Sequence, residues 1–164
     1  MKETVISPAM TPPDVSEPDR DDWRGALKPS ADGTALHHVG IVVASIDAVG
    51  DAFASLLGAE WDREIVHDPL QHARVTFMRC GRDSTAIELV EPDDEASPLH
   101  RSLSRGGGLH HLCYEVDALD SQLQSCRSAG ALVVRPPLPA AAFGGRRIAW
   151  VYTQQKLLVE YLER

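Results

Sequence analysis

The sequence predicts an α+β fold built from two tandem βαβββ modules, at about residues 35–92 and 108–164. The main observation is an internal repeat, because Leu-His-His-Val-Gly-Ile-Val-Val at residues 36–43 is matched by Leu-His-His-Leu-Cys-Tyr-Glu-Val at residues 109–116. After each octet come an amphipathic segment that ends at glycine and then three runs of strand-forming residues. A repeat constrains a fold more tightly than local propensity does, so each half is expected to be strand, helix and three strands.

Each predicted helix ends at a glycine. The first covers residues 45–57 and stops at Gly58, and the second stops at Gly130. Helical spacing predicts these buried side chains: Ile46, Val49, Phe53, Leu56 and Leu57 in the first helix, and Leu119, Leu123 and Cys126 in the second. The strands expected after the helices are residues 61–66, 73–79 and 85–90 in the first module, and 132–135, 147–153 and 157–162 in the second.

Composition indicates one domain preceded by an extension. With 164 residues, 43% of them hydrophobic and 24% charged, the chain suits a single core of ordinary size. Residues 1–34 hold five of the eleven prolines and an acidic run, so a mostly irregular N-terminal extension is expected there. Trp23 and Leu27 leave open that part of the extension is a lid or an arm swapped between two subunits.

Charge and cysteine content exclude several functional classes. A formal net charge of −8 argues against nucleic acid or an anionic membrane surface as the main partner. The chain has no apolar run of the roughly 20 residues that cross a bilayer and begins without a signal-like apolar segment, so a cytoplasmic location is expected. The cysteines Cys80, Cys113 and Cys126 lack CxxC spacing, which predicts neither a disulfide framework nor a thiolate zinc site.

The repeat places one histidine and one glutamate at matching positions of each module. Glu88 lies 50 residues after His38, and Glu160 lies 49 residues after His111. Each module thus offers an imidazole on its first strand and a carboxylate on its last strand. Two nitrogen and two oxygen donors are a set that binds a divalent metal ion and leaves room for water or substrate. A glutamate in an apolar strand is costly to bury unless it is paired or bound to a metal.

Strand alternation selects one histidine from each His-His pair. Neighbouring residues of a strand face opposite sides, so only one of each pair is expected to point into a shared cleft. The more apolar face of each strand is expected to pack on the helix, which favours His38 and His111 as the cleft residues. His37 and His110 are then expected on the helix side or at the strand end.

The motifs resemble those of the vicinal oxygen chelate superfamily, in which two βαβββ modules form a curved mixed sheet around a metal-binding cleft. Within it, the chain looks most like the methylmalonyl-CoA epimerases. The resemblance covers residues 35–164 and is carried by residues 36–43, 87–92, 97–99, 107–112 and 115–117. It departs from the pattern before the last strand, where epimerases carry His-Pro-Lys and this chain reads Val-Tyr-Thr-Gln-Gln-Lys.

The resemblance implies a site and an activity. His38, Glu88, His111 and Glu160 match the ligands of one divalent ion, which can be Co, Mn, Ni, Zn or Fe. The implied activity is that of a metal-dependent isomerase (epimerase) that moves a proton at a carbon next to a carbonyl. The implied substrate is a small molecule such as an acyl-CoA or another acyl thioester, and the implied assembly is a homodimer.

Residue roles beyond the metal ligands follow from the same chemistry. Glu88 and Glu160 come from the two modules and are expected to reach opposite faces of a planar enolate as the catalytic acid and base, in an order that the sequence leaves open. Gln71 is expected near the mouth of the cleft, and Arg146 and Arg147 follow two glycines that make a turn able to bind a carboxylate or phosphate. Loop polarity and a solvated hairpin explain these three residues equally well.

Other functions share this fold. A glyoxalase I-like lyase uses the same ligand types, and a natural-product pathway enzyme of this fold is favoured by the altered segment before the last strand. An extradiol dioxygenase is disfavoured, because the iron site of that family is similar to a set of two histidines and one glutamate, whereas this chain offers four candidate ligands. A ligand-binding protein of the bleomycin-resistance type is disfavoured by the presence of four ligand-type residues, although a fold alone cannot choose among these.

Overall fold

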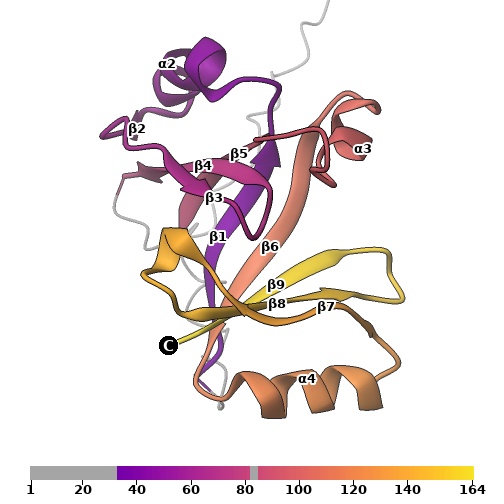
Figure 1. The fold of residues 1–164 in the computed structure, drawn as a ribbon. Helices are drawn as coiled ribbons and strands as arrows, with labels where there is room; N and C mark the ends of the chain where they lie inside the picture. Colours follow the sequence, from indigo (N-terminus) through magenta and orange to yellow (C-terminus); the bar gives the residue numbers. More distant parts are fainter. Residues whose placement is uncertain (1–32, 82–84) are drawn as a thin grey trace, which may run out of the picture.

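A computed structural model describes residues 33–81 and 85–164 of the chain (Figure 1). The predicted N-terminal extension, residues 1–34, therefore lies outside the described residues except for its last two. None of the helices in the described ranges is long and apolar enough to cross a membrane.

The described residues form two modules that follow each other along the chain. The first comprises β1 (Ala35–Val42), α2 (Ile46–Leu57), β2 (Ala59–Glu60), β3 (Val66–Asp68), β4 (Ala73–Cys80) and β5 (Ala86–Pro92). A short helix, α3 (His100–Leu103), lies in the connection to the second module. The second module comprises β6 (Gly108–Val116), α4 (Leu119–Ser128), β7 (Leu132–Pro139), the 3-10 turn η1 (Ala141–Phe143), β8 (Arg147–Tyr152) and β9 (Leu158–Glu163).

All strands belong to one mixed nine-stranded sheet, so the predicted α+β class and duplicated architecture are confirmed. The order is β2-β4-β5-β1-β6-β9-β8-β7, and β3 pairs with β4. Within each module the first and last strands are parallel, β1 with β5 and β6 with β9. The two modules join where β1 pairs with β6 in antiparallel fashion. This junction brings the two His-His pairs onto neighbouring strands at the centre of the sheet.

The central strand pair contains two bulges, one in each strand. The register between β1 and β6 skips His37 and His110, so each is an extra residue without a paired partner. The register pairs that flank the bulges are Leu36 with Tyr114, His38 with Cys113, Gly40 with His111, and Ile41 with Leu109. A bulge interrupts the strict alternation of side chains along a strand. The expectation that these histidines face away from the cleft is wrong for His110, which lies in the wall of the cavity described below. His37, the extra residue of the other bulge, contacts His38.

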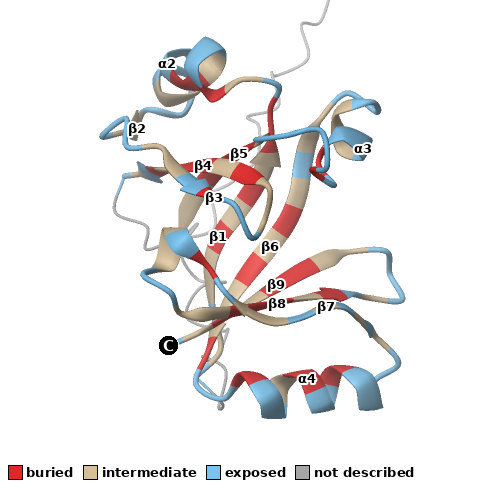
Figure 2. Ribbon diagram, in the orientation of Figure 1, coloured by how far each residue is buried: buried red, intermediate tan, exposed pale blue. Residues whose placement is uncertain are grey.

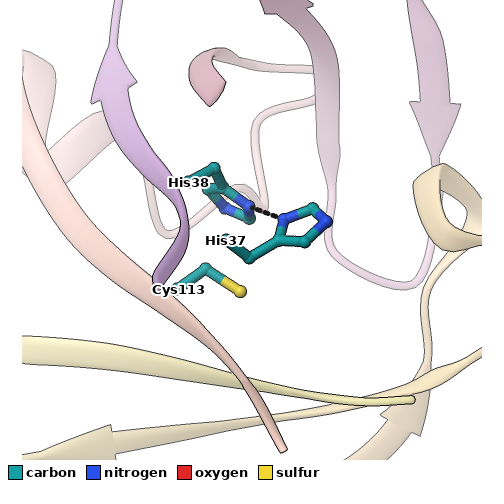
Figure 3. Close-up of side chains that lie close together, drawn as sticks. All are labelled: His37, His38 and Cys113. Carbon is teal, nitrogen blue, oxygen red and sulfur yellow. Dashed lines mark hydrogen bonds between the residues drawn. The ribbon is translucent and has the colours of Figure 1, made fainter. Parts of the chain in front are cut away.

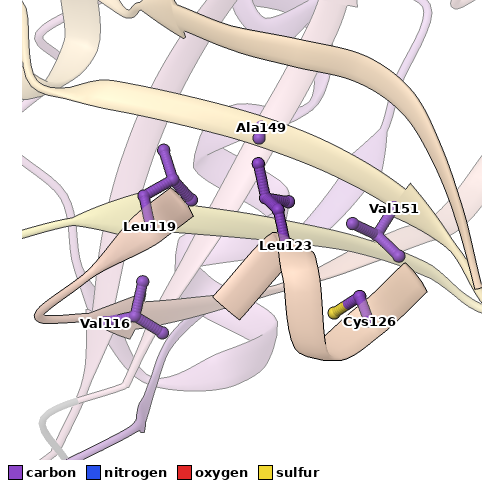
Figure 4. Packing of buried hydrophobic residues seen from close by; sticks show 6 residues of the cluster. All are labelled: Val116, Leu119, Leu123, Cys126, Ala149 and Val151. Carbon is purple, nitrogen blue, oxygen red and sulfur yellow. The ribbon is translucent and has the colours of Figure 1, made fainter. Parts of the chain in front are cut away.

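Each helix packs its apolar face on its own module. Leu119, Leu123 and Cys126 of α4 are buried against Val116, Ala149 and Val151 of the sheet (Figure 4). Ile46 of α2 packs with Val43, Met78 and Leu89. Figure 2 shows buried residues along the central strands and on the sheet-facing side of α4. Each module therefore has an apolar core of its own between its helix and its part of the sheet.

Several details of the first module differ from the predictions. Helix α2 begins after its N-cap Ser45 and ends at Gly58, whose φ of 59° is left-handed, as the sequence predicts. Leu56 and Leu57, predicted to be buried, are 81% and 40% exposed because the last turn of α2 extends past the core. The strand predicted at residues 61–66 is mostly loop, with short strands on either side of it.

Candidate metal centre

Four side chains from four strands converge at the middle of the sheet. His38 and His111 come from β1 and β6, and Glu88 and Glu160 come from β5 and β9. The Nε2 atoms of the two histidines are 3.0 Å apart. The Nε2 atom of His38 lies 3.4 Å from Oε2 of Glu88 and 3.1 Å from Oε2 of Glu160. The corresponding distances from His111 are 3.3 and 3.5 Å, and all four residues are at most 5% exposed.

These separations fit the donor atoms of one metal ion. Imidazole nitrogens and carboxylate oxygens bind first-row divalent ions at about 2.0–2.2 Å. Two donors at that distance are about 3.0 Å apart at a right angle and about 3.4 Å apart at a tetrahedral angle. The five measured donor separations lie between 3.0 and 3.5 Å. His38, Glu88 and His111 place their donor atoms within 4.8 Å of one another, and Glu160 lies within 3.5 Å of both imidazoles. The structure thus places each of the two glutamates that the sequence assigns to a metal site next to both central histidines.

Without a metal, the four groups hold one another in charged form. Burial alone would lower the pKa of His38, but Glu88 and Glu160 outweigh it and raise the pKa to about 10. The pKa of His111 is raised for the same reason. Burial would raise the pKa of both glutamates, yet the two imidazoles hold each pKa below its ordinary value. Both carboxylates are thus deprotonated at neutral pH.

A second histidine stands behind each central histidine. The Nδ1 atom of His37 lies 2.9 Å from Nδ1 of His38, and Nδ1 of His110 lies 3.0 Å from Nδ1 of His111. Burial, followed by the neighbouring imidazole, lowers the pKa of His37 and lowers that of His110 to about 4. Neutral His37 and His110 can therefore accept a hydrogen bond from the Nδ1–H groups of the central histidines, which leaves both Nε2 atoms directed at the centre.

Aromatic rings fix the two central imidazoles. Phe77, which pairs with Glu88 across β4 and β5, packs edge-on against His38 with ring centres 5.5 Å apart. Trp150, which pairs with Glu160 across β8 and β9, packs in the same way against His111 at 4.7 Å. The repeat thus extends to the aromatic residue that supports each imidazole.

Gly40 makes room for the His111 ring. A Cβ atom at this position would lie 2.0 Å from Cε1 and 2.3 Å from Nδ1 of His111. Gly40 is the register partner of His111, and Cys113 is the register partner of His38. A small residue therefore stands opposite each central imidazole, and at Gly40 no side chain of any size fits.

A second group of metal-ligand types includes His38 but is a poorer metal centre. His37, His38 and Cys113 place their donor atoms within 4.8 Å of one another (Figure 3). However, burial and the negative charge of Glu160 raise the pKa of the Cys113 thiol far above its ordinary value. A protonated thiol is a weak ligand, and Nδ1 of His38 already contacts His37. The set of two histidines and two glutamates is therefore the stronger candidate.

A cavity of about 530 Å³ opens onto this centre. Glu88, His111 and Glu160 lie in its wall together with His110 and Trp150. Most of the remaining lining is apolar, comprising Ala73, Val75, Val90, Ala96, Pro98, Leu99, Val134, Ala140, Ala142, Phe143, Ile148 and Leu158. A volume and lining of this kind are typical of a site for a small, largely apolar ligand.

The three residues predicted to contact substrate occupy different positions. Gln71 lies in the cavity wall. Arg147 instead pairs with Glu163 at 2.6 Å and with Asp120 at 3.1 Å. Arg146 pairs with Glu115 at 2.7 Å, and neither arginine lies in the cavity wall. Their carboxylate partners account for both arginines, so the turn at residues 144–147 is a surface ion-pair cluster.

Sequence reasoning did not single out several residues that shape the site. Trp150 and Phe77 lie in strands that were predicted, but only their register with the glutamates shows that they touch the imidazoles. Arg135 donates from Nη1 to Oε1 of Gln71 at 2.9 Å, across 64 residues of sequence. The repeat was the available signal for Phe77 and Trp150, since each lies about ten residues before its glutamate, whereas nothing in the sequence marked Arg135.

The chain belongs to the glyoxalase/bleomycin resistance protein/dioxygenase superfamily, whose family model matches residues 37–150. This match confirms the resemblance that the motifs indicated. It begins at the first histidine pair and ends within β8, before the strand that carries Glu160. The superfamily includes proteins of several activities, so membership defines the fold and leaves the activity open.

Several of the proteins to which the chain is similar are named as methylmalonyl-CoA epimerases. The chain is 31% identical over 119 residues to the ethylmalonyl-CoA/methylmalonyl-CoA epimerase of Cereibacter sphaeroides, covering 71% of this chain and 87% of the relative. It is 26% identical over 133 residues to the mitochondrial methylmalonyl-CoA epimerase of Dictyostelium discoideum, covering 79% and 78%. The crystal structure of methylmalonyl-CoA epimerase from Mycobacterium tuberculosis is similar with a TM-score of 0.72 and 27% identity, covering 86% of this chain and 94% of that one.

Proposed function

We propose that this protein is a metal-dependent epimerase or isomerase that moves a proton at a carbon next to a carbonyl, with methylmalonyl-CoA or a related 2-substituted acyl thioester as substrate. The observation that carries the proposal is the convergence of two buried imidazoles and two buried carboxylates on one point in the wall of a largely apolar cavity. The similarity to named epimerases supports the choice of substrate.

His38, Glu88, His111 and Glu160 would hold one divalent ion. A bound ion of this kind supplies positive charge that stabilises the oxygen anion formed when a carbon next to a carbonyl loses its proton. The donor types admit Co, Mn, Ni, Zn or Fe. His37 and His110 would keep the Nδ1 protons of the ligating histidines engaged, so that both Nε2 atoms remain available as ligands.

Glu88 and Glu160 are the proposed acid and base. Both carboxylates are deprotonated at neutral pH, which a proton acceptor requires. They come from β5 and β9, the equivalent strands of the two modules, and both lie in the cavity wall. This arrangement supports a two-base exchange, in which one carboxylate takes the proton from one face of the carbon. The other carboxylate first takes up a proton from solvent and then delivers it to the opposite face.

The cavity wall supplies the rest of the proposed chemistry. Its apolar side chains exclude water from the reacting carbon, which strengthens the electrostatic interactions inside. They also match the short alkyl branch of a 2-substituted acyl group. The volume of about 530 Å³ accommodates the acyl end of a thioester, and the long carrier chain would leave through the cavity mouth.

We extend the proposal to a homodimer, as the family resemblance implies, and to the cytoplasmic location expected from the sequence. Size-exclusion chromatography with light scattering tests the assembly. A mass of twice 17.9 kDa is expected, and a mass of 17.9 kDa at micromolar concentration would contradict it.

Proton exchange in D₂O, followed by NMR, tests the reaction. Metal-reconstituted protein is incubated with one epimer of methylmalonyl-CoA, beside a variant carrying His111→Ala and Glu160→Gln. Deuterium incorporation at C2 with inversion is expected for the wild type only. Stoichiometric metal without exchange would refute the assignment to methylmalonyl-CoA and direct the search to other carbonyl substrates. A chain that binds no metal would refute the metal-dependent reaction itself.

A further inference from the structure

Two buried hydrogen-bond donors in the cavity wall have no partner. In the part of the chain that the structure describes, the buried side-chain polar atoms without a hydrogen bond are Nε2 of Gln71 and Nε1 of Trp150. Buried N–H groups are nearly always paired, because an unpaired one has lost its water without replacement. Both residues line the cavity at the metal centre, so an acceptor atom of a bound ligand would satisfy them.

Arg135 determines which end of the Gln71 amide is left without a partner. Its Nη1 donates to Oε1 of Gln71 and its Nη2 donates to the carbonyl of Leu70, both at 2.9 Å. A guanidinium has donors and no acceptor, so only the amide oxygen can face it. The amide nitrogen is thereby turned away from Arg135 and left without a partner.

The loop that carries Gln71 is held in place. The backbone N–H groups of Leu70 and Gln71 both donate to Oδ1 of Asp68 at 3.1 Å. The other carboxylate oxygen of Asp68 accepts from the backbone of Ala141 at 2.8 Å, which ties the loop to the second module. The Gln71 donor is therefore fixed before a ligand binds.

Trp150 is fixed beside the proposed metal centre. It is the register partner of Glu160, and its ring packs edge-on against His111 with centres 4.7 Å apart. Its counterpart in the first module, Phe77, packs on His38 in the same way but has no N–H group. An aromatic ring without an N–H group is therefore enough to pack on the imidazole. This packing does not explain why Trp150 carries an indole N–H without a partner. The other indole nitrogen among the described residues, that of Trp61, is satisfied by Thr76 at 2.7 Å.

We propose that Gln71 and Trp150 are the substrate-orienting donors of the cavity, which bind oxygen atoms of a carbonyl or carboxylate group, and that Arg135 is the positioning residue for Gln71. The proposal rests on the proposed function, because it assumes that substrate enters this cavity. It specifies the substrate class further. The substrate carries acceptor oxygens toward these two donors, with an apolar group filling the rest of the pocket, and a compound that presents an N–H donor at this place is rejected.

NMR of the metal-reconstituted protein labelled with ¹⁵N tests the donor pair, and its readout is ligand binding rather than catalytic activity. The protein is titrated separately with methylmalonyl-CoA and with malonate. Trp150→Phe and Gln71→Glu assign the two side-chain N–H signals. The expected result is a downfield shift of both signals with at least one probe, while the Trp61 indole signal stays in place. If neither probe shifts the two signals, the proposal is overturned.

Variants separate the donor role from a structural role. Gln71→Glu keeps the shape and an oxygen for Arg135 but removes the donor, so it is expected to raise the Kd for the probe about 10- to 100-fold with unchanged metal content. Gln124→Glu makes the same charge change on an exposed part of α4 and is expected to leave the Kd unchanged. An unchanged Kd in Gln71→Glu would contradict the assignment of this donor.

The Arg135 role has its own readout. Arg135→Ala frees the amide to turn, so the Gln71 shift on binding is expected to vanish while the Trp150 shift remains, and Arg135→Lys restores part of the Gln71 shift. Loss of both shifts, or of neither, would overturn the positioning role. Exchange at C2 of methylmalonyl-CoA is measured in parallel. NMR shifts without exchange at C2 would refute the proposed reaction and support the donor pair. Exchange at C2 without NMR shifts would support the proposed reaction and refute the donor pair.

Discussion

The Nδ1 atom of His110 lies 3.0 Å from the Nδ1 atom of His111, and the pair His37 and His38 repeats this contact at 2.9 Å. Each contact exists because the first histidine of the pair is the extra residue of a bulge. The bulge turns that side chain toward its neighbour, so a local defect in the strand supports the ligating imidazole from behind. Two bulges in the central strand pair are thus part of the candidate metal centre.

Removing one of these contacts is expected to weaken metal binding. His110→Leu deletes the acceptor for the Nδ1 proton of His111, and loss of such a partner typically costs about 10- to 100-fold in metal affinity. Competition with a chromophoric chelator measures the Kd for Zn or Co. His110→Gln retains an acceptor and should lose less, and His100→Leu, on exposed α3, should lose nothing. Equal affinities for all three variants would contradict the supporting role.

A methyl group at Gly40 is expected to displace His111. The added Cβ would overlap the imidazole ring at 2.0 Å, so Gly40→Ala should lower the metal affinity at least about tenfold while the fold is retained. Metal content after dialysis and far-UV circular dichroism measure the two effects. Gly81→Ala is the control, because Gly81 has a positive φ of 59° but open space around it. Full metal content in Gly40→Ala would contradict this prediction, because it would show that the His111 ring can still bind the metal beside the added methyl group.

Metal binding is expected to release protons and to tighten as the pH rises. In the metal-free protein the pKa of His38 is raised to about 10, so this imidazole is charged at neutral pH and must lose a proton before it can ligate. Isothermal titration calorimetry at pH 7.5, in two buffers of different ionisation enthalpy, measures the release. A heat of binding that is identical in both buffers would contradict the raised pKa.

The same shift predicts how the metal-free protein responds to base. Because the folded pKa of His38 lies above its unfolded value of 6.5, its stabilising effect is complete below pH 6.5 and is lost as the pH rises toward about 10. The glutamates, whose folded pKa values are lowered, act in the opposite direction and lose their effect below about pH 4.5. Urea unfolding of metal-free protein between pH 6 and 10 should show falling stability, and metal-loaded protein should show a smaller fall.

Cys113 is expected to be dispensable for metal binding. Its thiol is fully buried and its raised pKa keeps it protonated, so Cys113→Ala should retain one metal ion per chain. In the native protein at pH 8, Cys80 should react with a thiol reagent before Cys113 does, because it is only half-buried. Loss of metal from Cys113→Ala with an intact fold would favour the alternative group of His37, His38 and Cys113.

The motif repeat predicted the topology and the four converging residues because both depend on spacing that the two halves share. What the repeat could not show was the consequence of pairing between strands. Strict alternation placed His37 and His110 away from the cleft, and the bulges between β1 and β6 arise only when the two modules dock. Leu56 and Leu57 fit a helical face in sequence, but the core ends before the last turn of α2.

A buried carboxylate needs a partner, but that partner can be either a metal ion or another residue of the protein. Glu88 and Glu91 lie on the same strand, and both are 5% exposed. Glu91 pairs with Arg74 and accepts a hydrogen bond from the backbone N–H of Ile46 at 2.5 Å, which fixes the start of α2. Among the described residues, Glu88 forms no ion pair with an arginine or lysine, and its carboxylate contacts the two imidazoles. Sequence alone does not distinguish the structural carboxylate from the proposed ligand, because Arg74 lies on another strand.

The contacts of Phe77 with His38 and of Trp150 with His111 show that the two halves share one arrangement, but a phenyl ring in one half is replaced by a larger indole ring with an N–H group in the other. An ancestral dimer of identical βαβββ chains would already present two imidazoles and two carboxylates on its twofold axis. Such a dimer would hold an ion, but its pocket would be the same on both sides and could not favour one orientation of a ligand. Two halves that belong to one chain can differ in sequence, so that here a matched set of donors faces an asymmetric pocket.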